Sequence, residues 1–219
     1  MNKKLIFTDV DGVLLNWEYA FNEWMEFQGH IPVDNHKDHY SIAKQYSLPS
    51  NNVGHNLIKQ FNASAAIGFL PPLRDAQKYM EMLVADGYRF VVLTSLSTDK
   101  YAKELRTRNL IKLFGDCFEE IICLPTGADK DDALAELAEK YGTGWWIEDK
   151  PSNADAGANA GFDSILIEHR HNLDYKGSAV VAPLWQDVYN IITQAKTEVT
   201  FVTGVLTHDT TRGNGGEKI

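Results

Sequence analysis

The sequence predicts an α/β fold, a doubly wound parallel sheet with a small helical cap inserted after the first strand. Short apolar runs that are typical of buried strands alternate along the chain with segments of helical length, and this alternation favours parallel β-α-β units. A polar stretch interrupted by prolines separates the first run from all the others. The alternation predicts the sheet, and the interruption predicts the cap.

Five apolar runs have the length and composition of buried strands: 4–7, 88–93, 118–124, 144–147 and 164–168. Segments with helical spacing or helix-start signals lie between and after them, at 15–28, 56–66, 73–86, 98–109, 129–141 and 185–195. One more helix is expected to begin at Pro151, because proline is favoured in a first helical turn. Thr98 and Asp99 are expected to cap the helix that follows them.

The insert has recognisable boundaries. Residues 30–56 are polar and contain two prolines and a glycine, which favours short helices and loops. Leu70-Pro71-Pro72 then ends the insert. We therefore expect a core of residues 1–14 and 72–195, a helical cap over 15–71, and a tail over 196–219 with one β-like run, 199–206, and a flexible end.

Composition excludes several classes of function. The chain has 219 residues, 44% of them hydrophobic, which is enough for one good core. A net charge of −9 argues against a broad nucleic-acid surface, and no apolar run approaches the roughly 20 residues of a membrane span. Cys117 and Cys123 are expected to be reduced core thiols, and no secretory segment is expected before the first strand. We expect a cytoplasmic protein for which a small anionic substrate is still possible, and its oligomeric state stays open.

The first strand ends in two carboxylates, Asp9 and Asp11, followed by Gly12, where the chain turns away. Ligands of open α/β sheets bind at the carboxyl ends of the strands. Two carboxylates there can hold a divalent metal, and one of them can attack an electrophile. The alternative is that both aspartates merely begin a polar turn.

Polar residues also follow the later strands: Thr94 and Ser95, then Lys130, then Glu148 and Asp149. The ends of parallel strands meet at one edge, so these residues are expected to converge with the two aspartates. Phosphoryl transfer needs a nucleophile, a metal, a cation and a hydrogen-bond donor for the phosphoryl oxygens. Each residue alone could instead be a helix cap or a solvated side chain.

These residues, in this order, resemble the four motifs of the haloacid dehalogenase-like (HAD) phosphohydrolases. The resemblance implies a Rossmann-like core in which Asp9 accepts the phosphoryl group and Asp11 handles the leaving-group proton. It implies phosphate binding by Thr94, Ser95 and Lys130. It also implies Mg²⁺ held by Asp9, Asp149 and the Asp11 carbonyl, with Glu148 supporting this set; where the family often has a further acid, this chain has Asn153.

Within that superfamily, the opening segment 9–18, Leu70-Pro71-Pro72 and His171-Asn172 are similar to the 5′(3′)-deoxyribonucleotidases. The resemblance covers residues 4 to 175 but not the middle of the cap. It implies that Trp17 stacks on the base of a nucleoside monophosphate. The alternative is that Trp17, Phe21 and Trp24 form a helix-packing stripe.

The sequence therefore predicts a Mg²⁺-dependent phosphomonoesterase acting on nucleoside (deoxy)monophosphates. A non-catalytic nucleotide binder of the same fold, a phosphatase of sugar or other small phosphates, and a phosphomutase stay open. A dehalogenase is disfavoured because it has no use for Asp11 or a metal, and a nucleic-acid end phosphatase is disfavoured by the acidic charge. A second metal site at His36, Asp38 and His39 lacks further ligands, and a solvated loop is expected there.

Overall fold

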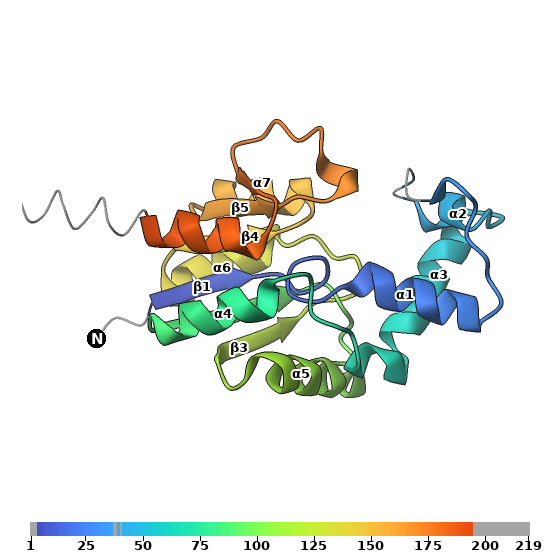
Figure 1. Cartoon of the computed structure of the whole chain (residues 1–219), viewed down its shortest axis with the longest axis horizontal. Helices are drawn as coiled ribbons and strands as arrows, with labels where there is room; N and C mark the ends of the chain where they lie inside the picture. Colours follow the sequence, from blue (N-terminus) through green and yellow to red (C-terminus); the bar gives the residue numbers. More distant parts are fainter. Residues whose placement is uncertain (1–3, 37–38, 40, 195–219) are drawn as a thin grey trace, which may run out of the picture.

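A parallel sheet forms the centre of the molecule (Figure 1). The computed structural model describes residues 4–36, 39 and 41–194. In these residues the sheet has six strands in the order β3-β2-β1-β4-β5-β6, and all neighbouring pairs are parallel. The strands are β1 (Lys4–Thr8), β2 (Tyr88–Thr94), β3 (Phe118–Cys123), β4 (Trp145–Glu148), β5 (Asp163–Ile167) and β6 (Val180–Ala182). The predicted α/β fold with a doubly wound parallel sheet is confirmed.

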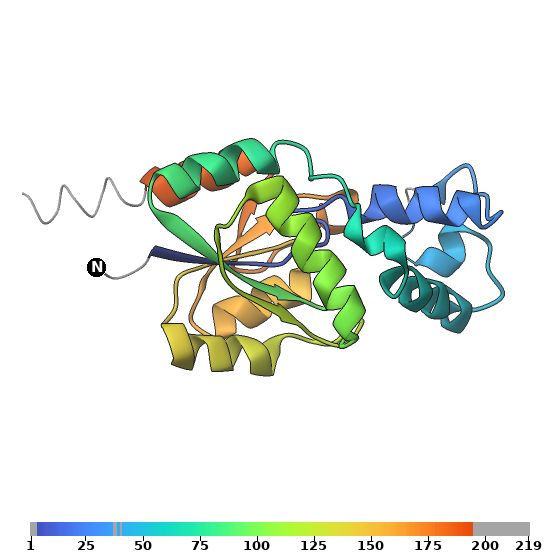
Figure 2. The same cartoon turned by 90° about the horizontal axis from the view of Figure 1, so that it is seen from below.

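Helices cover both faces of the sheet, as Figure 2 shows with the green and red helices on one side and the yellow helix on the other. The covering helices are α4 (Ala76–Ala85), α5 (Lys100–Phe114), α6 (Asp131–Tyr141), α7 (Pro151–Asn159) and a last helix over 185–194. Successive side chains of a strand point to opposite faces. Ile6 accordingly packs with residues of α4, α5 and the last helix, whereas Phe7 packs with residues of α6 and α7. β1 is therefore buried on both faces.

The helices between β1 and α4 are α1 (Trp17–Phe27), α2 (Ile42–Gln45), α3 (Asn51–Asn62) and the 3₁₀ helix η2 (Ala65–Gly68). Figure 1 shows α1, α2 and α3 beyond one end of the sheet. The two segments that join them to the core run side by side, because Leu73 N–H donates to the Leu14 carbonyl and Asn16 N–H donates to the Pro71 carbonyl. The division into a core (1–14 and 72–195) and a cap (15–71) stays a prediction.

α5 is longer than the sequence predicted. Asn109 was expected to end this helix, but α5 continues to Phe114 and is followed by Gly115, whose φ is 76°. The Asn109 side chain is buried and accepts from Leu70 N–H while donating to the Leu70 carbonyl. A polar side chain inside the helix is thus satisfied by a contact 39 residues away in sequence, which local patterns do not reveal.

Other element ends also differ. α3 begins at Asn51, earlier than the expected start at 56, because the Ser50 hydroxyl accepts from Val53 N–H as an N-cap. β6 was not predicted, since its run is only three residues long. The expectations for Asp38, the run 199–206 and the tail from 196 lie outside the described residues. In the described part of the chain, no helix combines the length and the apolar character needed to cross a membrane.

Candidate active site

The loop after β1 brings two carboxylates to the middle of the sheet edge. β1 lies between β2 and β4, so Asp9 directly follows a central strand. The chain turns at Gly12, whose φ of 78° lies in the left-handed region that favours glycine. A Cβ at this position would lie 2.3 Å from Asp149 Oδ2. Glycine therefore permits both the turn and the close approach of Asp149 to the loop.

A pocket of about 210 Å³ lies at this edge of the sheet. It collects side chains from the ends of several strands, as the topology requires. Its lining includes every site residue predicted from the sequence except Trp17, namely Asp9, Asp11, Thr94, Ser95, Lys130, Glu148 and Asp149. The structure thus brings seven of the eight predicted residues together, and their individual roles stay predictions.

Lys130 is a buried cation in the lining of the pocket. Its Nζ lies 2.9 Å from Asp9 Oδ1 and 2.7 Å from Glu148 Oε2, and its side chain is only 1% exposed. Burial alone would lower the pKa of Lys130, but the charges of Asp9 and Glu148 raise it above its usual range. Lys130 is therefore held as an ammonium by two carboxylates.

Asp9 titrates far from its ordinary range. Burial raises the pKa of Asp9 to about 7, against the opposing charge of Lys130 and with further raising by Glu148 and Asp11. Burial, Glu148 and Asp9 likewise raise the pKa of Asp149 well above its usual value. A cation beside these groups would favour their ionised forms.

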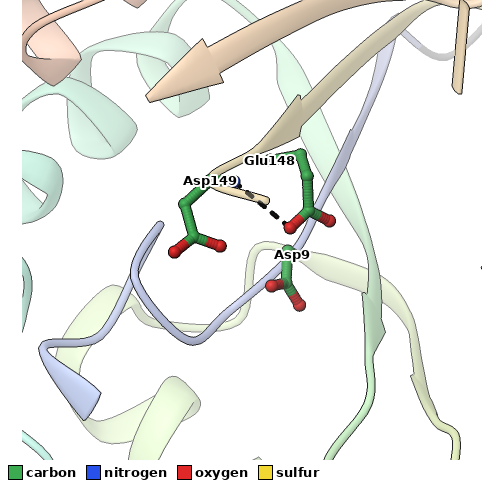
Figure 3. A group of neighbouring side chains, drawn as sticks. All are labelled: Asp9, Glu148 and Asp149. Atoms are coloured by element: carbon green, nitrogen blue, oxygen red, sulfur yellow. Dashed lines mark hydrogen bonds between the residues drawn. The ribbon is translucent and has the colours of Figure 1, made fainter. Parts of the chain in front are cut away.

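Asp9, Glu148 and Asp149 lie together at the ends of β1 and β4 (Figure 3). One carboxylate oxygen from each lies within 4.8 Å of the others, a spacing that suits a divalent cation. Among the described residues, no other set of three or more histidines, cysteines or acids is grouped so closely, and none forms around His36 and His39.

Glu148 differs from the other two acids in having both oxygens engaged. Its Oε1 accepts from the backbone N–H groups of Asp149 and Lys150, at 3.2 and 3.1 Å, while Oε2 accepts from Lys130. Its side chain therefore holds the start of the next loop and Lys130 at the same time.

Arg106 was missed by the sequence reasoning. It lies in α5, and its Nη1 and Nη2 donate to the two carboxylate oxygens of Asp11 at 2.6 and 3.2 Å. The Arg106 side chain is fully buried, whereas that of Asp11 is 23% exposed. These residues are 95 positions apart in sequence, so no local pattern could have paired them.

Thr94 and Ser95 occupy different positions in the pocket wall. The Thr94 hydroxyl oxygen is buried and has no hydrogen-bond partner among the described residues. The Ser95 hydroxyl donates to the Ala128 carbonyl at 2.8 Å and so fixes the loop that carries Lys130. Thr94 is thus the hydroxyl left available for a bound group.

The segment after β5 fixes the backbone around the pocket. The 3₁₀ helix η3 (Arg170–Asn172) places Asn172, whose amide nitrogen donates to the Asp149 carbonyl at 2.7 Å. His169 Nε2 lies 2.6 Å from the Gly12 carbonyl, and burial lowers the pKa of His169 to about 4. A neutral imidazole therefore donates from Nε2 to Gly12, and both contacts hold the two loops that carry aspartates.

Trp17 lies outside the pocket lining. Its ring stacks on Phe21 with 4.6 Å between centroids and meets Phe61 edge-on at 5.5 Å. Its Nε1 donates to Asn62 Oδ1 at 3.0 Å. These contacts join α1 to α3, which agrees with the packing alternative, and stacking of Trp17 on a nucleobase stays a prediction.

The architecture matches solved structures of known proteins. A haloacid dehalogenase-like family hydrolase from Streptococcus pneumoniae superimposes with a TM-score of 0.61 at 14% identity, over 87% of this chain and 98% of that chain. The fold is that of haloacid dehalogenase-like hydrolases. Two further matches are the HAD-hydrolase YfnB from Bacillus subtilis bound to magnesium (TM-score 0.59, 13% identity, 88% of this chain and 100% of that chain covered) and CbbY from Rhodobacter sphaeroides in complex with phosphate (TM-score 0.54, 18% identity, 86% and 96% covered).

Sequence comparison adds one relative outside these structures. No family model matches the chain. An uncharacterized 32.4 kDa protein of Enterobacteria phage T4, from the Gp30-rIII intergenic region, is 28% identical over 159 residues. The match covers 70% of this chain and 56% of the relative, so the chain spans little more than half of that protein's length. The HAD fold thus stands on the structural matches.

Proposed function

We propose that this protein is a Mg²⁺-dependent phosphomonoesterase that forms an aspartyl-phosphate on Asp9. One observation carries the proposal: a single pocket holds the Asp9 carboxylate, the Lys130 ammonium and the unpartnered Thr94 hydroxyl. These are the nucleophile, the cation and the hydrogen-bond donor that phosphoryl transfer requires. Phosphate in the CbbY complex supports the same use of this fold.

The proposed reaction has two steps. An Asp9 carboxylate oxygen attacks phosphorus, and the bond from phosphorus to the leaving oxygen breaks with its electron pair moving to that oxygen. Asp11 gives the leaving oxygen a proton. Water then attacks the phosphorus of the aspartyl-phosphate while Asp11 takes one of its protons, and the bond to Asp9 breaks, which restores the Asp9 carboxylate and releases inorganic phosphate.

Magnesium fits the donors present. Asp9 and Asp149 would each supply a carboxylate oxygen and Asp11 its backbone carbonyl, while the engaged carboxylate of Glu148 supports this set. The raised pKa values of Asp9 and Asp149 favour a cation here, because burial and mutual repulsion otherwise oppose their ionisation. When bound, the ion would neutralise charge on the phosphate oxygens. Magnesium in the YfnB structure supports this choice.

For the substrate we propose nucleoside (deoxy)monophosphates, on the resemblance of segment 9–18, Leu70-Pro71-Pro72 and His171-Asn172 to deoxyribonucleotidases. A second candidate is a phosphatase of sugar or other small phosphates. The contacts of Trp17 with Phe21 and Asn62 favour this candidate, because they engage the ring that was expected to stack on a base.

Release of inorganic phosphate from a panel of nucleoside monophosphates, sugar phosphates and p-nitrophenyl phosphate, with and without Mg²⁺, tests the function. We expect Mg²⁺-dependent turnover that the Asp9→Asn variant lacks. Nucleotide binding without any phosphate release would instead support a non-catalytic binder. Transfer of phosphate to a second sugar position without release would support a phosphomutase.

A further inference from the structure

Arg106 is a fully buried cation whose charge is directed at one group. Its two terminal nitrogens contact the two oxygens of Asp11, at 2.6 and 3.2 Å, and its Nε has no hydrogen-bond partner among the described residues. The Arg106 side chain is 0% exposed and is not part of the pocket lining, whereas Asp11 lines the pocket. Arg106 therefore reaches the pocket only through Asp11.

Stability is a weak reason to bury such a charge. Removing a guanidinium from water costs several kcal/mol, and buried ion pairs can often be replaced by apolar side chains without loss of stability. α5 is also held to the rest of the core by the apolar side chains of Ala102 and Leu110 and by the hydrogen bonds between Asn109 and Leu70. The position of the charge is thus better explained by what it does to the Asp11 carboxylate.

The guanidinium fork constrains Asp11 more tightly than a single charge would. Two parallel N–H···O bonds fix both the position and the plane of a carboxylate, and this geometry is specific to arginine. The backbone of Asp11 is also restrained, because the N–H of the neighbouring Gly12 donates to the Leu15 carbonyl. The carboxylate therefore has one orientation in which its exposed side faces the pocket.

We propose that Arg106 is a positioning residue that holds Asp11 in the orientation needed for proton transfer to the leaving oxygen. This inference rests on the proposed phosphomonoesterase function and deepens it. A general acid acts only when it is within hydrogen-bond reach of the leaving oxygen, and its contribution is typically about 10²- to 10⁴-fold.

A positioning role of Arg106 would affect two kinds of substrate differently, whereas a purely structural role would not. An alkoxide needs a proton as it leaves, whereas p-nitrophenolate leaves without one. Loss of Asp11 orientation should thus slow alkyl phosphates much more than p-nitrophenyl phosphate. A general loss of packing would slow both substrates alike.

The experiment measures kcat and KM with Mg²⁺ on an alkyl phosphate and on p-nitrophenyl phosphate for the parent, Arg106→Met, Arg106→Lys, Asp11→Asn and the Asp11→Asn/Arg106→Met double variant. Arg89→Met is the matched control. Arg89 is a partly buried arginine of β2 that pairs with Glu119 at 3.4 Å, away from the pocket lining. Melting temperatures are measured for every variant.

We expect Arg106→Met to lower kcat on the alkyl phosphate at least about 10-fold, with a change of less than about 3-fold on p-nitrophenyl phosphate. Arg106→Lys should also lower the ratio of kcat on the alkyl phosphate to kcat on p-nitrophenyl phosphate, because lysine keeps the charge but loses the two-point contact of the guanidinium. The double variant should be no slower than Asp11→Asn, because Arg106 acts only through Asp11. Arg89→Met should leave the ratio unchanged.

Equal losses on both substrates, a parent-like ratio in Arg106→Lys, or additive losses in the double variant would each overturn the positioning role. Faster alkyl phosphate turnover in Arg106→Met would overturn it too, since Arg106 would then restrain Asp11. If Arg106→Met fails to fold, the ratio of the two kcat values in Arg106→Lys alone tests the positioning role. Absence of Mg²⁺-dependent turnover in the parent would contradict the proposed function itself, a result distinct from all of these.

Discussion

Lys130 Nζ lies 2.9 Å from Asp9 Oδ1, in a place where the lysine side chain is 1% exposed. The same ammonium also pairs with Glu148 at 2.7 Å, and Asp149 lies beside both acids. One buried cation thus faces three carboxylates. Several measurable properties follow from this excess of negative charge.

Lys130→Met should destabilise the protein by about 3–5 kcal/mol, because removing one partner of a buried ion pair leaves an uncompensated charge. Urea denaturation at pH 7.5 without Mg²⁺ measures this loss. Adding Glu148→Gln to the same chain should recover part of it, since the amide removes the unpaired charge. No recovery in the double variant would show that the Lys130–Glu148 pair is not the source of the loss.

Asp9 should make the metal-free protein less stable as pH rises from about 4 to about 7. The pKa of Asp9 is raised from 3.8 to about 7, so over this range the folded state retains a proton that the unfolded state has released, and the free energy of unfolding falls with pH. The loss attributable to Asp9 should reach up to about 4 kcal/mol. Thermal denaturation of parent and Asp9→Asn from pH 4 to pH 8 measures it.

The difference in stability between the parent and Asp9→Asn isolates the contribution of Asp9 from that of His169, which changes stability with pH in the opposite direction. The pKa of His169 is lowered to about 4, so its contribution is present above about pH 6.5 and is lost as pH falls towards 4. Mg²⁺ should raise the melting temperature of the parent more at pH 8 than at pH 5, because the cation competes with protons for the same carboxylates. An equal Mg²⁺ effect at both pH values would contradict this linkage.

Asp9→Asn should abolish steady-state phosphate release while the chain stays folded, because an amide of nearly the same shape replaces the nucleophilic carboxylate. Phosphate release and circular dichroism are the two measurements. Asp163→Asn, at the exposed start of β5, is the matched control and should keep parent activity. Asp9→Asn activity within tenfold of the parent would rule out an aspartyl-phosphate on Asp9.

Asp149→Ala should raise the Mg²⁺ concentration needed for half-maximal activity by about tenfold or more, because one of the proposed carboxylate ligands is lost. A Mg²⁺ titration of activity measures the shift. Asp129→Asn is a suitable control, because Asp129 lies near Lys130 in sequence but its side chain is 84% exposed. An unchanged titration in Asp149→Ala would move the ligand role to Glu148 or to another group.

Trp17→Ala should lower the free energy of unfolding by about 2–4 kcal/mol, since the ring packs on Phe21 and Phe61. Activity on a nucleoside monophosphate and on p-nitrophenyl phosphate should then fall by similar factors. Trp17→Phe should keep the stacking on Phe21 and lose only the bond to Asn62. A selective loss of about 5- to 150-fold on the nucleotide alone would instead support base stacking by Trp17.

The sequence by itself determined the sheet and most of the pocket, because both follow from local signals. Apolar runs such as 88–93 specify buried strands, and the residue directly after a parallel strand must lie at its carboxyl edge. Asp9, Thr94 and Asp149 could therefore be assigned to one place without coordinates. The three-residue strand β6 was missed because so short a run carries too little periodic signal.

Only the tertiary structure decided which partner each polar group has. Arg106 meets Asp11 across 95 residues, and Asn109 of α5 bonds to Leu70 across 39 residues. Both contacts depend on how distant elements pack. The helical spacing of Trp17 is compatible with a ring that faces either a ligand or α3. The ring lies against Phe61 because α3 supplies an apolar surface there. Local patterns determine which elements form and which residues follow them, whereas side-chain partners depend on long-range packing.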